Sequence, residues 1–364
     1  MPLSKLYIHE EVISSPLVKK IQSHIDAPFY IVKDAKEVFN DIGSSIDPIK
    51  EGKRTLFLTR NKGPFIKNCP GTRSYICCGY KILHIGSYCV MDCSYCILQA
   101  YFHPPLLQFF VNHNKMFAQL RDIFNQKEIQ RIGTGEFTDS MIWDKWTNLS
   151  KVLIPMFARQ TCCVLELKTK TVNIKRLEDL DHNQKTILSW SLNTQRIIDD
   201  EERKTASLSA RLKAAAACES WGYPLSFHFD PLFIYKGCEK DYKEVIRALF
   251  SHVSWENIVW ISLGSFRFMG SLKPIIQKRF SRSKIIYGEF IPGMDGKMRY
   301  FKPLRVDLYR KIVNWIKEAA PGVLVYFCME DNEVWEKSLG FTPDQYGGLS
   351  RLLDQSAAKH CNLC

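Results

Sequence analysis

No stretch of the sequence reaches the roughly 18 consecutive apolar residues that a membrane-spanning helix needs. The first residues, MPLSKLYIHEE, lack the charged start and apolar core of a secretory signal peptide. Internal repeats and low-complexity tracts are missing as well, which excludes a repeat array. We therefore expect a globular, cytoplasmic protein that has no membrane partner.

Acidic residues are scarce relative to basic ones. The chain has 50 Lys and Arg against 38 Asp and Glu, which gives a formal net charge of +12. This balance favours contact with a polyanion, although a basic protein without any nucleic-acid role would carry the same charge. The 13 cysteines are an odd number in a chain without a signal peptide. We therefore expect free thiols in a reducing compartment rather than a disulfide framework.

Three of the cysteines stand close together in the segment 86–100, GSYCVMDCSYCILQA. Cys89, Cys93 and Cys96 have the spacing C-x3-C-x2-C, which brings three thiolates into one loop. Iron–sulfur clusters are held by closely spaced cysteines of this kind, and three ligands to a [4Fe–4S] cluster leave one iron open to a chelating ligand. A zinc site more often adds histidines or a second C-x2-C pair, and no such pair lies nearby. The loop therefore predicts an iron–sulfur cluster.

From this loop onward, strand-like and helix-like segments alternate. The expected strands are 80–85, 129–133, 162–167, 186–192, 225–229 and 258–263. The expected helices are 116–124, 141–156, 207–219, 240–250 and 274–280. Such alternation predicts an α/β fold with a parallel sheet, here a partial (β/α)6 barrel that is open along one side. We expect an N-terminal α/β extension at 1–78, the barrel at 79–282, and a C-terminal hairpin, helix and tail at 283–364.

Two basic stretches interleave with aromatic residues, a mixture that suits a nucleic-acid backbone. The first stretch carries Lys53, Arg54, Arg60, Lys62, Lys67 and Arg73. The second contains the turn-forming GMDG and predicts a hairpin at 285–305. Its second arm carries Lys297, Arg299, Tyr300, Lys302 and Arg305. A solvated loop and an edge hairpin that is kept soluble by its charges would have the same composition.

The cysteine loop resembles the signature of the radical S-adenosylmethionine (SAM) enzymes, and within that superfamily the chain is similar to the spore photoproduct lyase family. The similarity rests on CSYCILQ (93–99), ELKTK (166–170), SWSLN (189–193), ARLKAAAACESWGYPLSFHFDPLFIY (210–235) and FRF (266–268), in that order. It implies a lyase that holds a [4Fe–4S] cluster, cleaves SAM to a 5′-deoxyadenosyl radical and repairs a damaged DNA base. It also implies an external electron donor such as flavodoxin or ferredoxin.

The resemblance assigns roles to matching residues. Cys89, Cys93 and Cys96 would bind the cluster, and Tyr95 and Glu136 are the expected catalytic residues. The methionine amino group of SAM would meet the segment GTGE, whose contact residues are Gly133, Gly135 and Glu136. Further SAM contacts would come from Lys170, Ser191, Asn193 and Arg211, and Arg267 would meet SAM or the nucleic acid. For each polar residue, an ordinary structural hydrogen bond is the alternative.

Two positions depart from the family pattern. The lyases carry a cysteine after the second barrel strand, which returns a hydrogen atom to the product radical, and here that position falls on Glu136 or Phe137. They also carry a tyrosine after the third cluster cysteine, where this chain has Ile97. A carboxyl O–H or a phenyl ring is a poor hydrogen-atom donor compared with a weak S–H bond. Either another donor acts here, or the protein does not quench the substrate radical.

Two other functions stay open. Radical chemistry on a protein, peptide or small metabolite would make the basic surface incidental. A non-catalytic iron–sulfur or zinc protein that binds nucleic acid is disfavoured, because GTGE, ELKTK and SLN occur in the expected order. The sequence does not assign roles to Cys69, Cys77, Cys78, Cys361 and Cys364.

Overall fold

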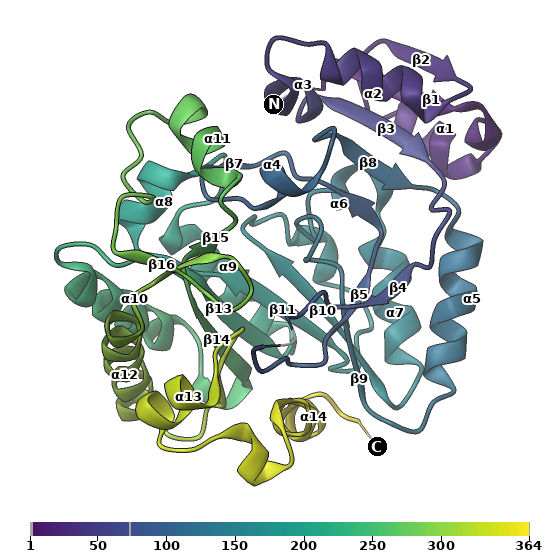
Figure 1. The fold of residues 1–364 in the computed structure, drawn as a ribbon. Coiled ribbons are helices and arrows are strands. Elements are labelled where there is room, and N and C mark those ends of the chain that lie inside the picture. The colour runs from purple at the N-terminus through teal and green to yellow at the C-terminus, as the bar shows by residue number, and fades with distance from the viewer. Residues whose placement is uncertain (1–2, 73, 364) are drawn as a thin grey trace.

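The main sheet of the protein curls into a half-barrel (Figure 1). The computed structural model describes residues 3–72 and 74–363, so Arg73 and Cys364 lie outside the described residues. The strand order is β18-β14-β13-β11-β10-β9-β5-β4, and every neighbouring pair is parallel except β4 with β5. The strands are β4 (Ile66–Asn68), β5 (Lys81–Leu83), β9 (Gln130–Gly133), β10 (Cys163–Thr169), β11 (Thr186–Ser191), β13 (Leu225–Leu232), β14 (Ile258–Ser265) and β18 (Val325–Phe327).

The predicted partial barrel is confirmed. The six expected strands are β5, β9, β10, β11, β13 and β14, and they lie side by side in chain order. The sequence prediction missed the two edge strands, β4 and β18, because each has only three residues and no clear period. These two edges border the open side of the half-barrel.

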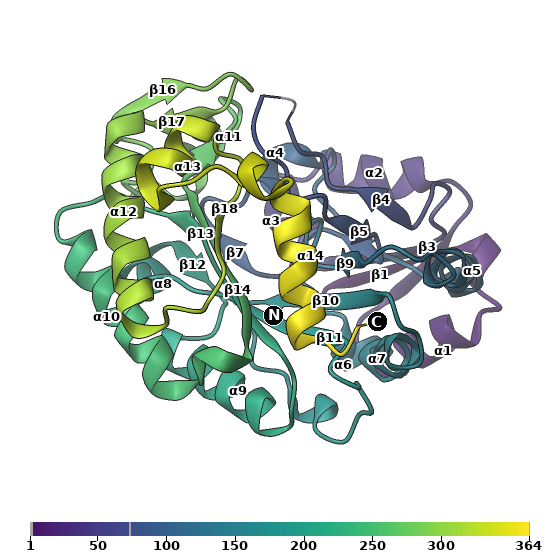
Figure 2. The ribbon, with the colours of Figure 1, turned by 90° about the horizontal axis from the view of Figure 1, so that it is seen from below.

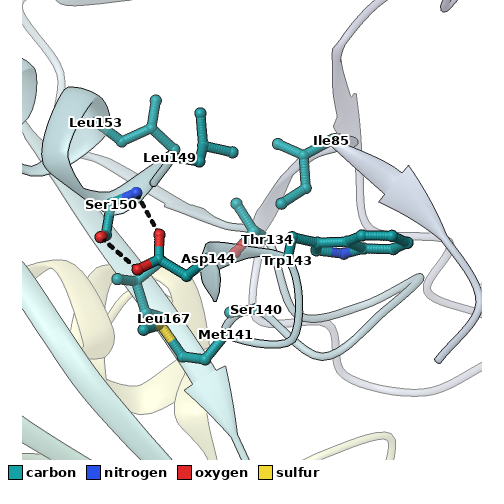
Figure 3. Close-up of a pocket in the computed structure, with 10 residues that line it drawn as sticks. All are labelled: Ile85, Thr134, Ser140, Met141, Trp143, Asp144, Leu149, Ser150, Leu153 and Leu167. Carbon is teal, nitrogen blue, oxygen red and sulfur yellow. Dashed lines mark hydrogen bonds between the residues drawn. The ribbon is translucent and has the colours of Figure 1, made fainter. Parts of the chain in front are cut away.

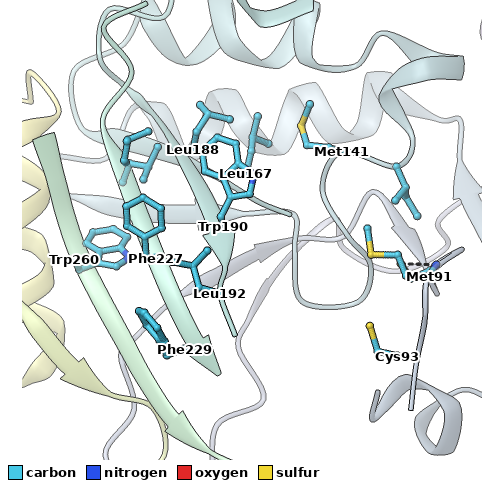
Figure 4. Close-up of a cluster of buried hydrophobic side chains, with 14 of the residues drawn as sticks. Met91, Cys93, Met141, Leu167, Leu188, Trp190, Leu192, Phe227, Phe229 and Trp260 are labelled. Atoms are coloured by element: carbon cyan, nitrogen blue, oxygen red, sulfur yellow. Dashed lines mark hydrogen bonds between the residues drawn. The ribbon is translucent and has the colours of Figure 1, made fainter. Parts of the chain in front are cut away.

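Side chains of β11 and β13 alternate between an apolar and a polar face. Leu188, Trp190 and Phe227 are fully buried, and Figure 4 shows them grouped together beside these strands. Ser189 and Ser226 lie on the other face, where their hydroxyls share a hydrogen bond. Because successive side chains of a strand lie on opposite faces, the apolar face packs into the core and the polar face lines the barrel interior.

The helices lie on the outside of the half-barrel (Figure 1). Those that match the predictions are α5 (His113–Phe124), α9 (Leu208–Ser220), α10 (Cys238–His252) and α11 (Leu272–Arg279). The prediction of one helix over 141–156 is wrong, because this segment forms α6 (Asp144–Thr147) and α7 (Ser150–Ala158). Asn148 adopts the left-handed conformation, with φ 51°, and ends α6 at that point.

A second sheet packs at the N-terminal side of the molecule, in the order β2-β1-β3-β8-β6. Its strands are β1 (Lys5–His9), β2 (Phe29–Val32), β3 (Thr55–Thr59), β6 (Gly86–Ser87) and β8 (Leu107–Phe110). The helices of this region are α1 (Pro16–Gln22), α2 (Ala35–Gly43) and α3 (Pro48–Gly52). Because β6 and β8 come from beyond the boundary expected at residue 78, shared strands tie the N-terminal extension to the barrel.

The C-terminal region contains the predicted hairpin, formed by β16 (Phe290–Pro292) and β17 (Met298–Tyr300), and β17 also pairs with β15 (Arg267–Phe268). The chain ends with α12 (Lys302–Ala319), α13 (Asn332–Leu339) and α14 (Leu349–His360), and Figure 2 shows α14 lying against the barrel strands. Cys361, directly after α14, is buried. Among the helices of the described chain, none has the length and apolar character required to cross a bilayer.

Candidate active site

The three-cysteine loop lies between β6 and the short helix α4 (Leu98–Tyr101). Cys89 and Cys93 are buried and Cys96 is half-buried. The ammonium group of Lys53 donates hydrogen bonds to the backbone carbonyls of Cys89, at 3.1 Å, and of Met91. Lys53 is itself buried, with 4 % of its surface exposed, so this contact belongs to the interior. The N-terminal extension therefore supplies a cation that holds the cysteine loop.

The donor set of three cysteines in one loop fits an iron–sulfur cluster. Burial raises the pKa of the Cys89 and Cys93 thiols, and the nearby Cys96 thiol contributes to both shifts. Within the described ranges, however, no three His, Cys, Asp or Glu side chains converge on one point where a single metal ion would sit. In a [4Fe–4S] cluster each cysteine binds a different iron, so the thiolates stand apart. The backbone N–H of Met91 also donates to the sulfur of Cys89, at 3.4 Å, as donors around cluster sulfurs do.

Tyr95, Lys170 and Arg211 converge on Glu202, a residue that the sequence did not single out. The Tyr95 hydroxyl donates to the Glu202 carboxylate, and Arg211 forms an ion pair with it at 2.6 Å. The ammonium group of Lys170 lies 5.9 Å from the centre of the Tyr95 ring. Its charge, together with that of Arg211, holds the pKa of Glu202 below its ordinary value, although burial acts in the opposite direction. This group surrounds Cys93, because β12 (Glu202–Arg203) pairs with β7 (Asp92–Cys93).

The glycines of GTGE let the backbone of this turn pack closely against side chains of the barrel interior. A Cβ atom on Gly133 would lie 1.5 Å from the Tyr80 hydroxyl oxygen, and one on Gly135 would lie 2.9 Å from Cβ of Lys168. Any larger residue at either position would therefore clash. Glu136 is half-buried beside this turn, so its carboxylate remains accessible. The structure thus places Gly133, Gly135 and Glu136 at the carboxyl end of β9, as expected.

Asn193 and Arg211 have protein partners for their polar atoms. The Asn193 side chain donates to the carbonyl of Pro231 at 2.9 Å and accepts from the Tyr242 hydroxyl at 3.0 Å. Arg211 is completely buried and also donates to the carbonyl of Ser191 at 2.8 Å. These contacts position β11 and Glu202, so contact of Ser191, Asn193 or Arg211 with a cofactor stays a prediction.

A polar network occupies the barrel interior. Glu166 accepts hydrogen bonds from the hydroxyls of Ser189, at 2.7 Å, and Ser226, at 3.0 Å. His228 contacts the same carboxylate at 2.8 Å. Burial raises the pKa of Glu166, but other interactions lower it, and the contact with His228 is the largest of these. The net result is a pKa well below the ordinary value. The alternation of polar residues in ELKTK, SWSLN and SFHFD could have indicated this network, whereas no motif could have indicated Lys53 or Glu202.

The two departures from the family pattern lie near the cysteine loop. Ile97 directly precedes α4 and is 37 % exposed. Because the residue is an isoleucine, this position provides no phenol. Phe137 stacks on Tyr101 of α4, with ring centres 6.1 Å apart. Neither residue supplies a weak X–H bond.

A small pocket lies behind the GTGE turn (Figure 3). It is lined mainly by apolar side chains and by Thr134, while the carboxylate of Asp144 accepts from both the N–H and the hydroxyl of Ser150. Its free space is no larger than about one water molecule. The pocket is therefore a packing gap rather than a cofactor site.

The five residues expected to contact nucleic acid are engaged with the protein itself. Lys297 pairs with Asp295, and Lys302 pairs with Asp331 and Glu333. Arg267 forms an ion pair with Asp230 at 3.1 Å. Tyr300 is buried and accepts from the N–H of Ile234 at 3.3 Å. In the first basic stretch, Lys53 is buried, Arg60 pairs with Glu11, Lys67 contacts His84, and Lys62 is exposed.

Arg299 is the most buried basic residue of the hairpin. It pairs with Asp295 at 2.8 Å, stacks over the ring of Tyr75 at 4.0 Å, and donates to the carbonyl of Met329 at 3.0 Å. Both members of the Arg299–Asp295 pair are almost fully buried, with 2 % and 3 % of their side chains exposed. The contact of these five residues with nucleic acid stays a prediction, but their geometry favours a structural role for the hairpin.

We expect Arg299→Ala to lower the free energy of unfolding by up to about 3 kcal/mol, because Asp295 would lose its closer partner and keep only Lys297, at 3.4 Å. The salt dependence of DNA binding should not change, since a lost phosphate contact would reduce the slope of log K against log salt by about 0.9. Chemical denaturation and a salt titration of DNA binding measure the two quantities, with the exposed Lys62→Ala as the comparison. A reduced slope at unchanged stability would show that Arg299 contacts phosphate.

Comparison with known proteins gives a consistent result. The family model described as spore photoproduct lyase matches residues 36–302. A spore photoproduct lyase from Clostridium acetobutylicum is 25% identical over 255 residues, which cover 69% of this chain and 72% of that protein. The one from Bacillus subtilis is 27% identical over 289 residues, which cover 77% and 83%.

Solved structures share the same architecture. A cysteine-to-alanine mutant of spore photoproduct lyase with dinucleoside spore photoproduct superimposes with a TM-score of 0.79 at 24% identity, covering 90% of this chain and 100% of that chain. A double mutant with bound AdoMet and dinucleoside spore photoproduct gives a TM-score of 0.77 at 23% identity, covering 90% and 99%. At this level of identity the similarity establishes the fold of the half-barrel.

Proposed function

Because the chain belongs to the spore photoproduct lyase family, we propose that it is a radical SAM lyase that repairs a thymine lesion of the spore photoproduct type in DNA. The observation that carries this proposal is the three-cysteine loop, which is held by Lys53 and whose Tyr95 contacts Lys170 and Glu202. Family membership makes a non-catalytic binding protein a poor alternative. The solved relatives with dinucleoside spore photoproduct and AdoMet support the same substrate and cofactor here.

Cys89, Cys93 and Cys96 would hold the [4Fe–4S] cluster, and the cluster with bound SAM supplies the 5′-deoxyadenosyl radical. Lys170, next to Tyr95, would provide a positive charge for a carboxylate, and Glu136 would accept a hydrogen bond from an ammonium group. Arg211 would hold Glu202 in place, and Glu202 in turn fixes the hydroxyl of Tyr95. These contacts hold Glu202 and Tyr95 in position before the ligands bind.

Apolar walls would keep water away from the radical. Phe233 packs on the Tyr95 ring, with ring centres 5.3 Å apart, and Phe266 packs on Phe233 at 4.9 Å. All three rings are buried. Excluding water and other hydrogen donors suppresses side reactions of a reactive intermediate.

The open side of the half-barrel would admit the lesion. A base inside duplex DNA cannot reach a barrel interior, so the damaged dinucleotide would have to leave the stack. The net charge of +12 favours approach to the DNA backbone. An external reductant of the flavodoxin or ferredoxin class would supply the electron, and a reducing cytoplasm would protect the cluster.

Anaerobic reconstitution tests the proposal. We expect protein supplied with iron, sulfide, SAM and dithionite to form 5′-deoxyadenosine, and to release thymidines from dinucleoside spore photoproduct. Liquid chromatography with mass spectrometry detects both products. A fully clustered preparation that forms no 5′-deoxyadenosine would rule out the radical SAM activity. Formation of 5′-deoxyadenosine without lesion repair would instead indicate a protein, peptide or small-metabolite substrate.

A further inference from the structure

The hydrogen-atom donor cysteine of the family is absent from this chain, and another cysteine of the fold can take its role. The donor position falls on Glu136 or Phe137, and the sequence has no cysteine between Cys96 and Cys162. A thiol that is distant in the sequence can still lie beside this position in the barrel. The inference below rests on the proposed function, since it concerns the hydrogen atom that completes the repair.

Cys328 follows edge strand β18 and lies toward the barrel interior. Tyr326 pairs with Ser262 of β14, and alternation along the strand places Cys328 on the same face as Tyr326. The N–H of Cys328 donates to the carbonyl of Leu263 at 3.0 Å, which extends the strand pairing by one residue. Its sulfur accepts from the guanidinium of Arg267 at 3.6 Å. Cys328 is half-buried, so its thiol is held in place but remains reachable.

Two charged residues connect Cys328 with the GTGE turn. Burial raises the pKa of the Cys328 thiol and the Arg267 guanidinium lowers it, and the charges of Glu136 and Lys168 contribute smaller effects to the same thiol. Lys168 also packs directly on Gly135, where an added Cβ would meet its side chain at 2.9 Å. Cys328 and the turn that carries the family donor position therefore share charged neighbours at the carboxyl edge of the barrel.

Cys328 lies at the open side of the half-barrel, between edge strands β18 and β4. The segment that follows β4 reaches the other edge, where the N–H of Ile76 donates to the carbonyl of Glu330 at 3.1 Å. The thiols of Cys69 and Cys78 are both within electrostatic range of Cys328. Cys69 and Cys78 are therefore the thiols with which Cys328 has to be compared.

An unpaired hydroxyl at the GTGE turn indicates a ligand site in the barrel interior. The Tyr80 hydroxyl is buried and has no hydrogen-bond partner among the described residues. It lies against Gly133, and the charges of Glu166 and Glu136 contribute with burial to raising its pKa. A buried hydroxyl without a partner is unfavourable. A polar atom of a bound substrate would satisfy it.

We propose that Cys328 is the hydrogen-atom donor of this enzyme and replaces the cysteine that the family carries after the second barrel strand. The S–H bond of Cys328 breaks homolytically as a C–H bond forms on the product thymine radical, which leaves a thiyl radical on Cys328. The thiyl radical returns to the thiol when it takes one electron from the flavodoxin- or ferredoxin-class reductant and one proton from solvent.

The neighbouring thiols are less suited to this role. Burial raises the pKa of Cys328 to about 11, so the thiol keeps its proton at neutral pH. Cys69 lies next to the amino end of β5, where its N–H donates to the carbonyl of Tyr80, and not at the carboxyl edge. Cys78 also precedes the amino end of β5, where its carbonyl accepts from Arg131, and its thiol interacts with the adjacent Cys77 thiol.

Isotope transfer tests the proposal. In D2O the thiol exchanges to S–D, so the wild-type protein should place solvent deuterium in the repaired thymine. Cys328→Ala and Cys328→Ser should both lose this transfer while they still form 5′-deoxyadenosine, because an O–H bond does not replace S–H. A merely structural role would be rescued by serine. Unchanged deuterium transfer in Cys328→Ala, or its loss in Cys69→Ala or Cys78→Ala alone, would overturn the assignment.

Alkylation provides a readout that does not depend on turnover. At alkaline pH, where part of the Cys328 thiol is ionised, we expect iodoacetamide to label Cys328 in the reconstituted protein, and dinucleoside spore photoproduct to protect it, while the exposed Cys77 stays reactive. Peptide mass spectrometry measures both sites. If the dinucleoside leaves labelling of Cys328 unchanged, Cys328 does not face the substrate and the proposal fails. Absence of 5′-deoxyadenosine from wild-type protein would refute the proposed function instead.

Discussion

Cys93→Ala is expected to abolish cleavage of SAM while the fold remains intact. Cys93 is buried in the loop and pairs through its backbone with Glu202. Removing a residue that merely supports a metal ligand costs about 10–100-fold in affinity or activity, and removing a ligand itself should cost more than that. The visible absorption of the reconstituted cluster and the yield of 5′-deoxyadenosine measure the effect.

A control variant separates loss of the cluster from loss of packing. Cys218 on α9 is as buried as Cys93 but lies outside the three-cysteine loop. We therefore expect Cys218→Ala to keep both the absorption and the product, with only the modest destabilisation that a small cavity causes. If Cys93→Ala retained a full cluster and formed 5′-deoxyadenosine, another residue would have to be a ligand and our assignment would be wrong.

The fold could be predicted because its strands are long buried runs with clear turns between them. β10, β11, β13 and β14 each have six to eight residues, nearly all of them buried, and such runs give strong periodic patterns. The edge strands β4 and β18 have three residues each and were missed. A single residue, Asn148 in a left-handed conformation, divides a segment that otherwise has a continuous helical pattern.

The candidate site could be predicted only where its residues belong to motifs. Tyr95 and Lys170 were expected near the cluster, and the structure brings them within 5.9 Å of each other. Lys53 and Glu202 belong to no motif, and only the pairing of distant segments reveals them. Composition also cannot show whether a charge is free, so Arg299 was expected to contact nucleic acid although it is buried with Asp295.

The second large effect is expected from Arg211→Ala, which should lower the free energy of unfolding by about 3–5 kcal/mol. Arg211 is completely buried, and its partner Glu202 has 1 % of its side chain exposed. Without the guanidinium, Glu202 becomes a poorly compensated buried charge, and the carbonyl of Ser191 loses a donor. Chemical denaturation of the protein without cluster measures this loss directly.

A double mutant decides whether Arg211 positions the site or binds the cofactor. If it acts through Glu202, Arg211→Ala combined with Glu202→Gln should destabilise the protein by less than the sum of the single variants, because removing the charge of Glu202 removes part of the penalty. The affinity for SAM, measured by calorimetry on reconstituted protein, should then fall in both single variants, since each disturbs the hydroxyl of Tyr95 and its neighbour Lys170. A loss of SAM affinity in Arg211→Ala at unchanged stability would instead identify a direct contact. Additive stability effects would show that the pair at 2.6 Å contributes little.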